Sequence, residues 1–595
     1  MKGNKKMNRC FVMPVVVGLM SGAAFLSATA ADLTVSGLDD CAAANRLAIQ
    51  RAVDEVSAQG GGRVTLPVGV WTTGSIRLKD GVELHLPKGA TLKGSLSAAD
   101  YNANDEFPEN FWSEAEEWSG GHLVYAHHAQ NVAITGEGVL DGNGSAFFGE
   151  CDEDSRWPGY KYGLKLHPLD RAWFRPGPMV AVFCSKGVRI EGVTLANTPC
   201  WTCHLRCCDG VTLRGVTIDA DRTIANSDGF SIDCTRNVLV EKCVIKTGDD
   251  GFAIRASCKL HAATNACENI VIRDCDVWSC CYAIRFGIGS GTIRNIDVID
   301  TRLHEASKSG FGFTTAWIAS KRDCYIEDIR VRNCTVAECV NPVHVELSAG
   351  DSHVTGVKFE NCTFSTLLPI CLTGGERMQM LFSNCVRHPI EKLRVRHRRG
   401  WGEREIRNGR NVFADVRGDL SKVTVENCKP EPFGTHGVLA LSVAGRSFAD
   451  WERWLPVLSE FGAHLTFFVE GEFDPATVRT AKRLMSGGHS IGIRGQSAEL
   501  LPTVIRQFRV AYVPVRVMAG AEGLSNRQLN GLERAPAMDE AAGVDAVLDA
   551  IRRAGSSKVV VRLAAKGDFL TPEALKRILS AARDSEVRVL GLDDF

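Results

Sequence analysis

The fold is decided by a stretch whose recurring triplets read Val188-Arg189-Ile190, Val211-Thr212-Leu213, Val238-Leu239-Val240 and Ile270-Val271-Ile272. Successive triplets lie 23, 27 and 32 residues apart, and no amphipathic helix pattern lies between them. Short strands that recur every 20 to 50 residues or so are typical of a solenoid. The stretch therefore predicts an all-β, right-handed parallel β-helix solenoid, in which equivalent residues of successive coils stack about 4.8 Å apart.

The strand pattern covers about residues 120–428, and a solenoid of this kind needs caps, because an open terminal coil exposes unpaired backbone groups. Residues 42–58 have helical periodicity and predict an N-terminal cap helix; residues 60–62, all Gly, then turn the chain into a strand at 63–67. The apolar positions of this helix are Ala44, Leu47, Ala48, Val53 and Val56. At the other end, residues 387–410 are rich in Arg, and we expect a solvated loop there rather than a binding site.

Cysteine is unevenly distributed, since all 22 Cys lie at or before Cys428. Six of them recur in one setting: Lys242-Cys243, Asp274-Cys275, Asn333-Cys334, Asn361-Cys362, Asn384-Cys385 and Asn427-Cys428. A small disulfide scaffold does not need such similar dipeptides, so we predict a ladder of small buried thiols, one per coil. The groups at 203–208 and 280–281 complete no tetrahedral set of Cys and His, and we expect no metal.

Beyond Pro430 the period of the sequence changes. Strand-like segments at 437–443, 464–468, 558–563 and 587–592 alternate with helical ones at 451–461, 474–485 and 571–585. This alternation indicates a smaller α/β domain with largely parallel strands at 431–595, after a β-helix domain at 31–430.

The composition and the N-terminus indicate where the protein acts. A balance of 69 Lys and Arg against 70 Asp and Glu gives no electrostatic case for a nucleic-acid or membrane-surface partner. Residues 1–30 begin basic, continue with an apolar run from Phe11 to Leu26 and end in Ala28-Thr29-Ala30, the plan of a secretory signal peptide. The run contains Pro14 and Gly18 and is too short for a membrane anchor. We expect a secreted or periplasmic protein with no membrane attachment after signal cleavage.

Two acidic motifs carry the chemistry: Asn226-Ser227-Asp228-Gly229 and Thr247-Gly248-Asp249-Asp250-Gly251. Asp228 and Asp249 are 21 residues apart, close to one coil, so stacking brings their carboxylates to one face. A single Asp-Gly is commonly a turn, but two such motifs one coil apart are less easily explained that way. Repulsion and burial raise the pKa of at least one acid, as inverting glycoside hydrolysis needs, with its protonated acid and ionised base about 6.5 to 9.5 Å apart.

The acidic motifs occur together with Gly60-Gly61-Gly62-Arg63-Val64, Gly136-Glu137-Gly138, Asp141-Gly142 and Asn197-Thr198-Pro199-Cys200-Trp201. In this combination, about residues 35–430 resemble glycoside hydrolase family 28, the polygalacturonase-like β-helix enzymes. The resemblance implies hydrolysis of a pectic polysaccharide, with Asp249 as the general acid and Asp228 and Asp250 holding and activating the water. It also implies that Asn226 binds substrate.

The sequence departs from the family at its sugar-binding positions. The family's His falls on Tyr282, and the Arg and Lys that grip the galacturonate carboxylate fall on Gly312 and Thr314. An anionic sugar needs a cation, preferably a bidentate Arg, so Arg255 and Arg285 are candidate replacements. The alternative is that both point outward as solvated residues. Tyr282, Arg255 and Arg285 complete the predicted substrate-binding set.

Residues 437–595 weakly resemble the polysaccharide deacetylase family at Leu465-Thr466-Phe467-Phe468-Val469, Gly488-His489-Ser490-Ile491-Gly492 and Thr571-Pro572-Glu573-Ala574-Leu575. In that family an Asp pair ends the first strand and two His bind a metal. Here residues 437–449 contain no Asp, and the His positions are Arg494 and Ala498. Neither can replace an imidazole ligand, so we expect an inactive module that binds sugar or packs against the rest.

Two other functions compete with hydrolysis. The loss of these family residues is also compatible with a non-catalytic carbohydrate-binding protein. Three adjacent acids repel one another, however, and keeping them at that cost argues against a loss of catalytic function. A β-helix lyase needs a Ca²⁺-binding acidic cluster and a basic proton abstractor, which the three Asp fit less well. We expect a monomer that acts on a polysaccharide or oligosaccharide without a cofactor and without a nucleic-acid partner.

Overall fold

The structure is a computed structural model of the 595-residue chain. In the solenoid it describes residues 31–103, 106, 121–149, 163–164, 175–258, 265–315, 323–347, 350–373, 377–397, 400–405, 413–417 and 422–430. In the C-terminal part it describes residues 438–445, 453–461, 463–470, 481, 484, 489–494, 515–519, 533–534, 539–541, 543–554, 558–563, 571–585 and 587–590. The predicted signal peptide at 1–30 lies outside the described residues.

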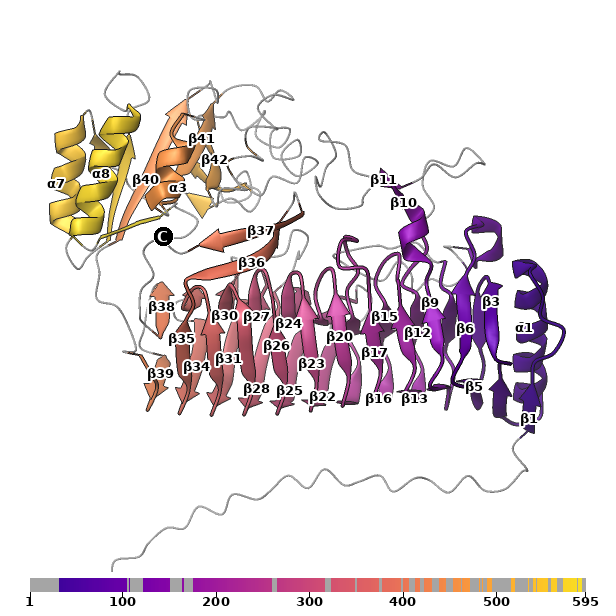
Figure 1. The fold of residues 1–595 in the computed structure, drawn as a ribbon. Helices are drawn as coiled ribbons and strands as arrows, with labels where there is room; N and C mark the ends of the chain where they lie inside the picture. The colour runs from indigo at the N-terminus through magenta and orange to yellow at the C-terminus, as the bar shows by residue number, and fades with distance from the viewer. Residues whose placement is uncertain are drawn as a thin grey trace, which may run out of the picture.

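Three long parallel sheets form the body of the molecule (Figure 1). Sheet A has 13 strands: β1 (Ala31–Thr34), β2 (Gly62–Thr65), β5 (Val82–Leu86), β8 (Ala133–Gly136), β13 (Lys186–Glu191), β16 (Asp209–Arg214), β19 (Arg236–Glu241), β22 (Ala266–Arg273), β25 (Thr292–Ile299), β28 (Tyr325–Arg332), β31 (His353–Glu360), β34 (Met378–Ser383) and β39 (Val423–Glu426). Sheet B has 11 strands: β3 (Gly69–Thr73), β6 (Ala90–Gly94), β9 (Val139–Asp141), β14 (Thr194–Ala196), β17 (Thr217–Asp219), β20 (Val244–Thr247), β23 (Asp276–Ser279), β26 (Arg302–His304), β29 (Thr335–Cys339), β32 (Thr363–Thr366) and β35 (Val386–Pro389). Sheet C also has 11: β4 (Ile76–Leu78), β7 (Val124–His127), β12 (Val180–Phe183), β15 (Cys203–Arg206), β18 (Phe230–Asp233), β21 (Phe252–Ala256), β24 (Tyr282–Gly289), β27 (Ser309–Thr314), β30 (Asn341–Glu346), β33 (Ile370–Thr373) and β38 (Ala414–Arg417).

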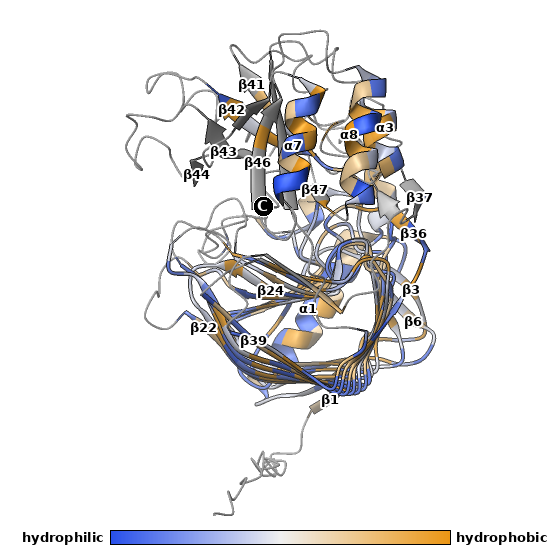
Figure 2. Ribbon diagram, turned by 90° about the vertical axis from the view of Figure 1, so that its left-hand side faces the viewer, coloured by the Kyte–Doolittle hydropathy of each residue, from blue (hydrophilic) through white to orange (hydrophobic). Residues whose placement is uncertain are grey.

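Each coil runs through one strand of sheet A, one of sheet B and one of sheet C, and then begins the next coil. Seen along its axis, the molecule closes around a core that the three sheets enclose (Figure 2). Equivalent apolar residues of successive coils stack in that core, as Ile232, Ile254 and Phe286 do in sheet C. The predicted right-handed parallel β-helix is thereby confirmed.

The predicted cap helix is α1 (Ala42–Ala58), with the predicted bounds. Its buried face includes Ile49, Val53 and Val56, whereas Leu47, which the sequence pattern placed on the apolar stripe, is 52% exposed. Asn45 is fully buried, and its side-chain amide donates to the carbonyls of Asp39 and Thr72. The helix therefore closes the first coil by both apolar packing and hydrogen bonds.

The cysteine dipeptides form the predicted ladder. The strand register stacks Cys243 on Cys275, and further along the axis Cys334, Cys362 and Cys385 follow one another, each of them buried. The first residue of each dipeptide has a positive φ, which turns the chain from sheet A into sheet B. The described cysteines are all free thiols, so these are packing residues rather than disulfides.

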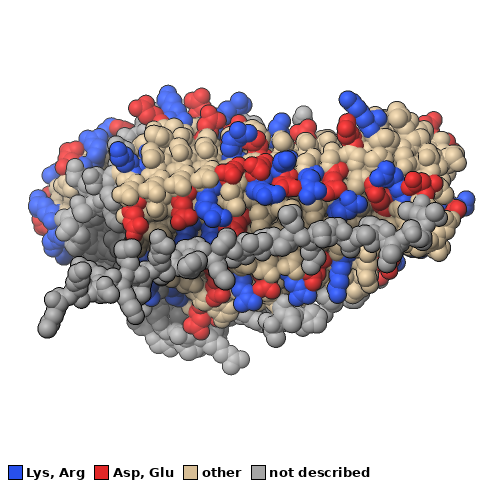
Figure 3. All heavy atoms as spheres, turned by 90° about the horizontal axis from the view of Figure 1, so that it is seen from below, with Lys and Arg blue, Asp and Glu red and all other residues tan. Residues whose placement is uncertain are grey.

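Pairs of opposite charge cover the outer face of sheet A. Glu241 accepts from Arg214 of the preceding coil and Arg273 of the following one, both at 2.5 Å, and Glu268 accepts from Arg294 at 2.7 Å. Figure 3 shows both signs intermixed on this side of the molecule. Such a mixed surface creates no field of one sign over this face of the solenoid.

The turns between sheets B and C carry the insertions of the solenoid. The connections β6–β7 and β9–β12 are long and contain the 3₁₀ helices η1 (Ala98–Asp100) and η3 (Gly144–Phe147) and the antiparallel pair β10 (Phe148–Gly149) and β11 (Gly163–Leu164). Near the other end, β36 (Lys392–His397) and β37 (Gly400–Glu405) form an antiparallel hairpin. The loop expected at 387–410 is therefore wrong: alternate residues Leu393 and Val395 pack with Val340 and Leu367, and this burial fixes a strand.

The C-terminal part is an α/β unit, as the changed period predicted. Its strands are β40 (Val438–Gly445), β41 (Thr466–Glu470), β42 (Ser490–Arg494), β43 (Val515–Ala519), β44 (Glu533–Arg534), β45 (Asp539–Ala541), β46 (Lys558–Leu563) and β47 (Arg588–Leu590), and its helices include α3 (Leu455–Phe461), α7 (Val544–Ala554) and α8 (Pro572–Asp584). All of the strand pairs in this sheet are parallel. Across the described part of the chain, no helix has the length and hydropathy to span a membrane.

Candidate active site

The acidic motifs lie in two successive turns between sheets B and C. The register of β18 on β21 pairs Phe230 with Phe252, and the backbone N–H of Gly229 donates to the carbonyl of Asp250 at 2.9 Å. Asp228 therefore stacks on Asp250, not on Asp249 as the 21-residue spacing indicated, because the coil at this point is one residue longer. Both stacked acids are buried, at 3% and 1% exposure.

Asp249 occupies the turn beside this stack and is half-buried. Its carboxylate accepts from the backbone N–H of Asp250 at 3.0 Å, and its carbonyl accepts from the hydroxyls of Thr247 and Ser279, both at 2.7 Å. Ser227, which replaces the family's Thr, accepts from the N–H of Gly248 at 3.0 Å. These bonds tie the two acidic turns together and bring the three predicted catalytic Asp into one cluster.

Two buried arginines face two of the acids. The Arg255 guanidinium lies 3.5 Å from the Asp228 carboxylate and 4.2 Å from the ring centroid of Trp201. The Arg285 guanidinium lies 3.3 Å from the Asp250 carboxylate, which also accepts from the backbone N–H of Tyr282 at 3.2 Å. The solvated alternative for Arg255 and Arg285 is therefore wrong: both are on the outer face of sheet C, but they are only 2% and 6% exposed and belong to the acidic cluster.

Arg285 also reaches the positions where the family has its Arg and Lys. The register of β24 on β27 stacks Arg285 on Gly312, and its Nε donates to the hydroxyl of Thr314 at 2.9 Å. A Cβ on Gly312 would come within 2.5 Å of the Tyr282 ring. The absence of a side chain at Gly312 thus makes room for Tyr282, while Arg285 supplies a cation from the preceding coil.

Tyr282 lies between groups that sequence reasoning missed. Its hydroxyl is 3.4 Å from Nδ1 of His344, and the two rings are nearly parallel with centroids 6.3 Å apart. The Lys308 ammonium lies 5.1 Å from the Tyr282 ring centroid. His344 and Lys308 come from later coils, and no local motif marks them. It is the register of β27 on β30, which pairs Gly312 with His344, that brings His344 near the acidic cluster.

Asn226, predicted to bind substrate, lies two residues before Asp228 in the same turn and has a φ of 55°. Its side-chain oxygen accepts from Arg175 at 3.3 Å, and Arg175 also donates to the carbonyl of Pro199 at 2.8 Å. The structure thus holds Asn226 beside the acidic cluster through a residue far away in the sequence.

Cys281 is close to the acidic cluster. The side chains of Asp249, Asp250 and Cys281 present ligand-type atoms that lie within 4.8 Å of one another. Burial and then the charge of Asp250 raise the pKa of the Cys281 thiol well above its usual range. A raised pKa keeps the thiol protonated at neutral pH, which does not suit a nucleophile.

A buried polar network lies beside the acidic cluster on sheet C. Asp233 accepts from Arg206 at 3.2 Å and from the Ser257 hydroxyl at 2.5 Å, and His204 lies 3.7 Å from it. Hydrogen bonding from His204 and the charge of Arg206 lower the pKa of Asp233 far below its usual range, although burial acts in the opposite direction. Burial lowers the pKa of His204 to about 3. The imidazole is thus neutral, and the network holds a fixed negative charge between Arg206 and Arg255.

The cluster opens on one side. Asp228 and Asp250, in the turns, and Arg255 and Arg285, on sheet C, are buried, whereas Asp249 and Cys281 are half-buried and Lys308 is exposed. All three of the more accessible residues belong to the turns between sheets B and C. The more accessible part of the cluster therefore lies at the edge formed by these turns.

Comparison with known proteins agrees with the motifs. The family model of Glycosyl hydrolases family 28 matches residues 58–371. A probable polygalacturonase of Vitis vinifera is 27% identical over 313 residues, which cover 50% of this chain and 59% of that protein. The chain thus spans about three fifths of that relative's length.

Two solved structures are similar to different shares of the chain. An exopolygalacturonase from Thermotoga maritima is 23% identical, with a TM-score of 0.49, covering 67% of this chain and 92% of that one. A family 4 carbohydrate esterase from Streptomyces lividans is 16% identical, with a TM-score of 0.23, covering 26% of this chain and 93% of that one. The deacetylase resemblance of residues 437–595 remains a prediction.

Proposed function

Because the chain belongs to glycosyl hydrolase family 28, we propose that it hydrolyses glycosidic bonds of a pectic or related acidic polysaccharide, with inversion at the anomeric carbon. The observation that carries the proposal is the arrangement of three Asp in two stacked turns, of which two face buried guanidinium groups. In such an arrangement the surroundings of the three Asp differ, so that one can act as the protonated acid while the other two are charged bases.

The proposed roles follow from the surroundings of each Asp. Asp249, half-buried on the open edge, donates a proton to the glycosidic oxygen. Asp228 and Asp250 hold the water and accept its proton as it attacks the anomeric carbon. The guanidinium groups of Arg255 and Arg285 stabilise negative charge on these two acids, which general bases must carry.

An acidic sugar fits the cations of the site. Arg255, Arg285 and Lys308 surround the acids and Tyr282, and Asn226 adds a polar group from the turn of Asp228. Arg285 takes over the function of the missing family Arg and Lys, since it donates to Thr314 from the adjacent coil. A uronate carboxylate is the anion that these groups would bind in a pectic chain.

The decisive experiment compares the wild type with Asp249→Asn in reducing-end assays on polygalacturonate, other uronate polymers and neutral glycans. We expect release of reducing ends from an acidic polymer and a loss of about 10²- to 10⁴-fold in the variant, because a general acid contributes that much. Asp274→Asn is the matched control, since Asp274 is an exposed turn residue at a ladder position where other coils have Asn. Equal activity in wild type and Asp249→Asn would refute the assignment.

The same assay separates the alternatives. A β-helix lyase would release products with the ultraviolet absorbance of an unsaturated uronide, and a carbohydrate-binding protein would bind the polymer without releasing reducing ends. Proton NMR of the first product distinguishes inversion from retention by its anomeric configuration.

We further propose three segments: a signal peptide at 1–30, a hydrolase domain at 31–430 and an inactive α/β module at 431–595. The protein would then act as a secreted or periplasmic monomer. N-terminal sequencing of the exported protein tests the signal peptide, and gel filtration tests the monomeric state. One equivalent of zinc held by residues 431–595 would contradict the inactive assignment.

A further inference from the structure

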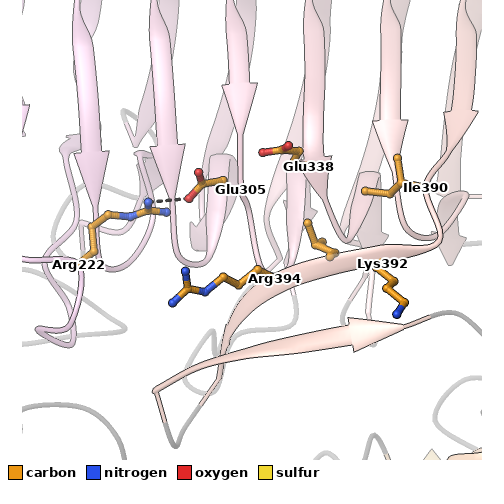
Figure 4. A pocket seen from close by; sticks show the side chains of 7 residues that line it. Arg222, Glu305, Glu338, Ile390, Lys392 and Arg394 are labelled. Carbon is orange, nitrogen blue, oxygen red and sulfur yellow. Dashed lines mark hydrogen bonds and ion pairs between the residues drawn. The ribbon is translucent and has the colours of Figure 1, made fainter.

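A pocket of about 490 Å³ lies on the edge to which the acidic cluster opens (Figure 4). One wall comes from the turns between sheets B and C, which carry Arg222 and Glu305, and from β29, which carries Glu338. The other wall is β36, with Lys392 and Arg394. The volume is within the range of sites that hold small organic ligands.

The pocket is linked to the acidic cluster by direct contacts. Arg222 belongs to the turn that leads to Asp228, and its carbonyl lies 3.7 Å from the sulfur of Cys280. Cys280 precedes Cys281, whose sulfur is within 4.8 Å of the Asp249 and Asp250 carboxylates. A chain that passes Asp249 along this edge therefore meets the pocket on the side of the C-terminal coils.

The hairpin holds its cations in place. Leu393 and Val395 are 5% and 7% exposed and pack with Val340 and Leu367, so the intervening Arg394 projects from a fixed strand. In Figure 4 the Arg394 side chain extends toward Arg222, whose guanidinium lies 2.7 Å from Glu305. A preorganised wall of this kind lowers the entropy lost on binding.

The charges on the pocket wall favour an anion. Three cations, Arg222, Lys392 and Arg394, oppose two carboxylates, and one of these, Glu305, is already paired with Arg222. Arginine binds carboxylates with a planar pair of donors, and carboxylate or hydroxyl groups of a sugar also suit the mixed polar lining.

We propose that this pocket is a subsite that binds a uronate unit of the polysaccharide, one or more units from the bond that Asp249 cleaves, through Arg394 and Lys392. This inference rests on the proposed function and adds to it a specificity determinant on a hairpin outside the three sheets. The Arg-rich segment, expected to be only a solvated face, then selects acidic substrates.

The test uses the full-length protein with galacturonate oligomers of increasing length. Arg394→Ala and Lys392→Ala are each expected to raise KM for the longer oligomers about tenfold, as loss of one charge-assisted contact does, with kcat changed less than about twofold. Arg394→Lys restores part of the affinity. Methyl-esterified oligomers lack the carboxylate charge, so the wild type and the variants should have the same KM for them.

Arg294→Ala is the matched control, because Arg294 pairs with Glu268 on the outer face of sheet A and its loss changes net charge equally. An unchanged KM for Arg394→Ala and Lys392→Ala, while Asp249→Asn abolishes hydrolysis, overturns the subsite and leaves the proposed function intact. If the wild type hydrolyses none of the polymers, calorimetric binding of the oligomers still decides: affinity weakened by Arg394→Ala supports the subsite, and unchanged or absent binding refutes it.

Discussion

At the scale of single residues, the site differs from the family pattern by exchange between neighbouring coils. The family's Arg and Lys positions are Gly312 and Thr314, and Arg285, stacked on Gly312, donates to Thr314. Tyr282 stands at the family's His position and extends over Gly312 toward His344. A cation and an aromatic ring therefore occupy the space that three family side chains would fill.

Replacing Gly312 by Ala should disturb the Tyr282 ring, because the new Cβ would lie 2.5 Å from its Cδ1 atom. We expect destabilisation by about 1 to 3 kcal/mol, the usual range for overpacking, measured by urea unfolding. In the double variant Gly312→Ala with Tyr282→Ala, the ring that the new Cβ would strike is gone. The loss of stability should therefore be smaller than the sum of the losses in the two single variants. Additive effects would show that the ring does not limit this position.

Arg285→Lys should lower kcat/KM by roughly 10- to 100-fold. A lysine has one compact ammonium and cannot keep both the contact with Asp250 and the hydrogen bond to Thr314. The loss should be smaller than the roughly 10²- to 10³-fold cost of removing a whole preorganised donor at developing charge, because lysine keeps the positive charge. Arg273→Lys on the outer face of sheet A is the control and should keep full activity; equal rates in both variants would remove Arg285 from the site.

At the scale of elements, the cysteine ladder explains why one dipeptide recurs. The residue before each cysteine has a positive φ, as in Asp274 at 54° and Asn333 at 54°, and the cysteine then turns inward. The register places Thr301 on the same ladder, between Cys275 and Cys334. The position thus requires a small side chain that fits under the turn, and sulfur chemistry plays no part.

Cys275→Thr should therefore change the free energy of unfolding by less than about 1.5 kcal/mol, because Thr301 shows that a threonine fits the neighbouring position. Cys275→Leu overpacks the same site and should destabilise by about 1 to 3 kcal/mol. Urea unfolding measures both. A reductant should leave the melting temperature of the wild type unchanged, since the described cysteines are free, and a clear drop would reveal a bridge.

At the scale of the whole molecule, buried histidines set the response to acid. Burial lowers the pKa of His122 to about 4 and that of His204 to about 3. Unfolded histidine titrates near pH 6.5, so between these values the unfolded chain binds more protons, and stability falls as the pH falls. Asp233, with its lowered pKa, adds loss of stability only below about pH 4, where its unfolded form takes up a proton.

Between pH 7 and pH 5 each of these histidines should remove about 2 kcal/mol of stability, which thermal melts across this range would record. His122→Gln keeps a donor for the Pro178 carbonyl, which the His122 ring now contacts at 2.7 Å, and removes the titration. The variant should lose about 2 kcal/mol less than the wild type over the same range. An identical pH dependence would assign the acid response to other groups.

The sequence predicted the solenoid, the cap helix and the cysteine ladder because each depends on local periodicity. It misplaced the partner of Asp228 by one residue, since coil length varies and a shift of one residue changes which side chain faces outward. Lys308 and His344 were missed because their contacts with Tyr282 cross coils, and such pairs leave no local pattern. The hairpin was missed although Leu393 and Val395 alternate with cations, because the many Arg residues indicated a solvated loop.

The stacking of coils has a consequence for how this molecule would measure its substrate. Asp249 lies between β20 and β21, and the β36 hairpin is inserted between β35 and β38, several coils further along the stack, in which each coil advances about 4.8 Å. Adding or removing a coil between them would move the wall relative to the acid only in whole steps of that size. The distance between the acids and the pocket is thus fixed by the number of coils between them. A protein with more or fewer coils there would bind a sugar unit at a different position along the chain, without any change in the acids.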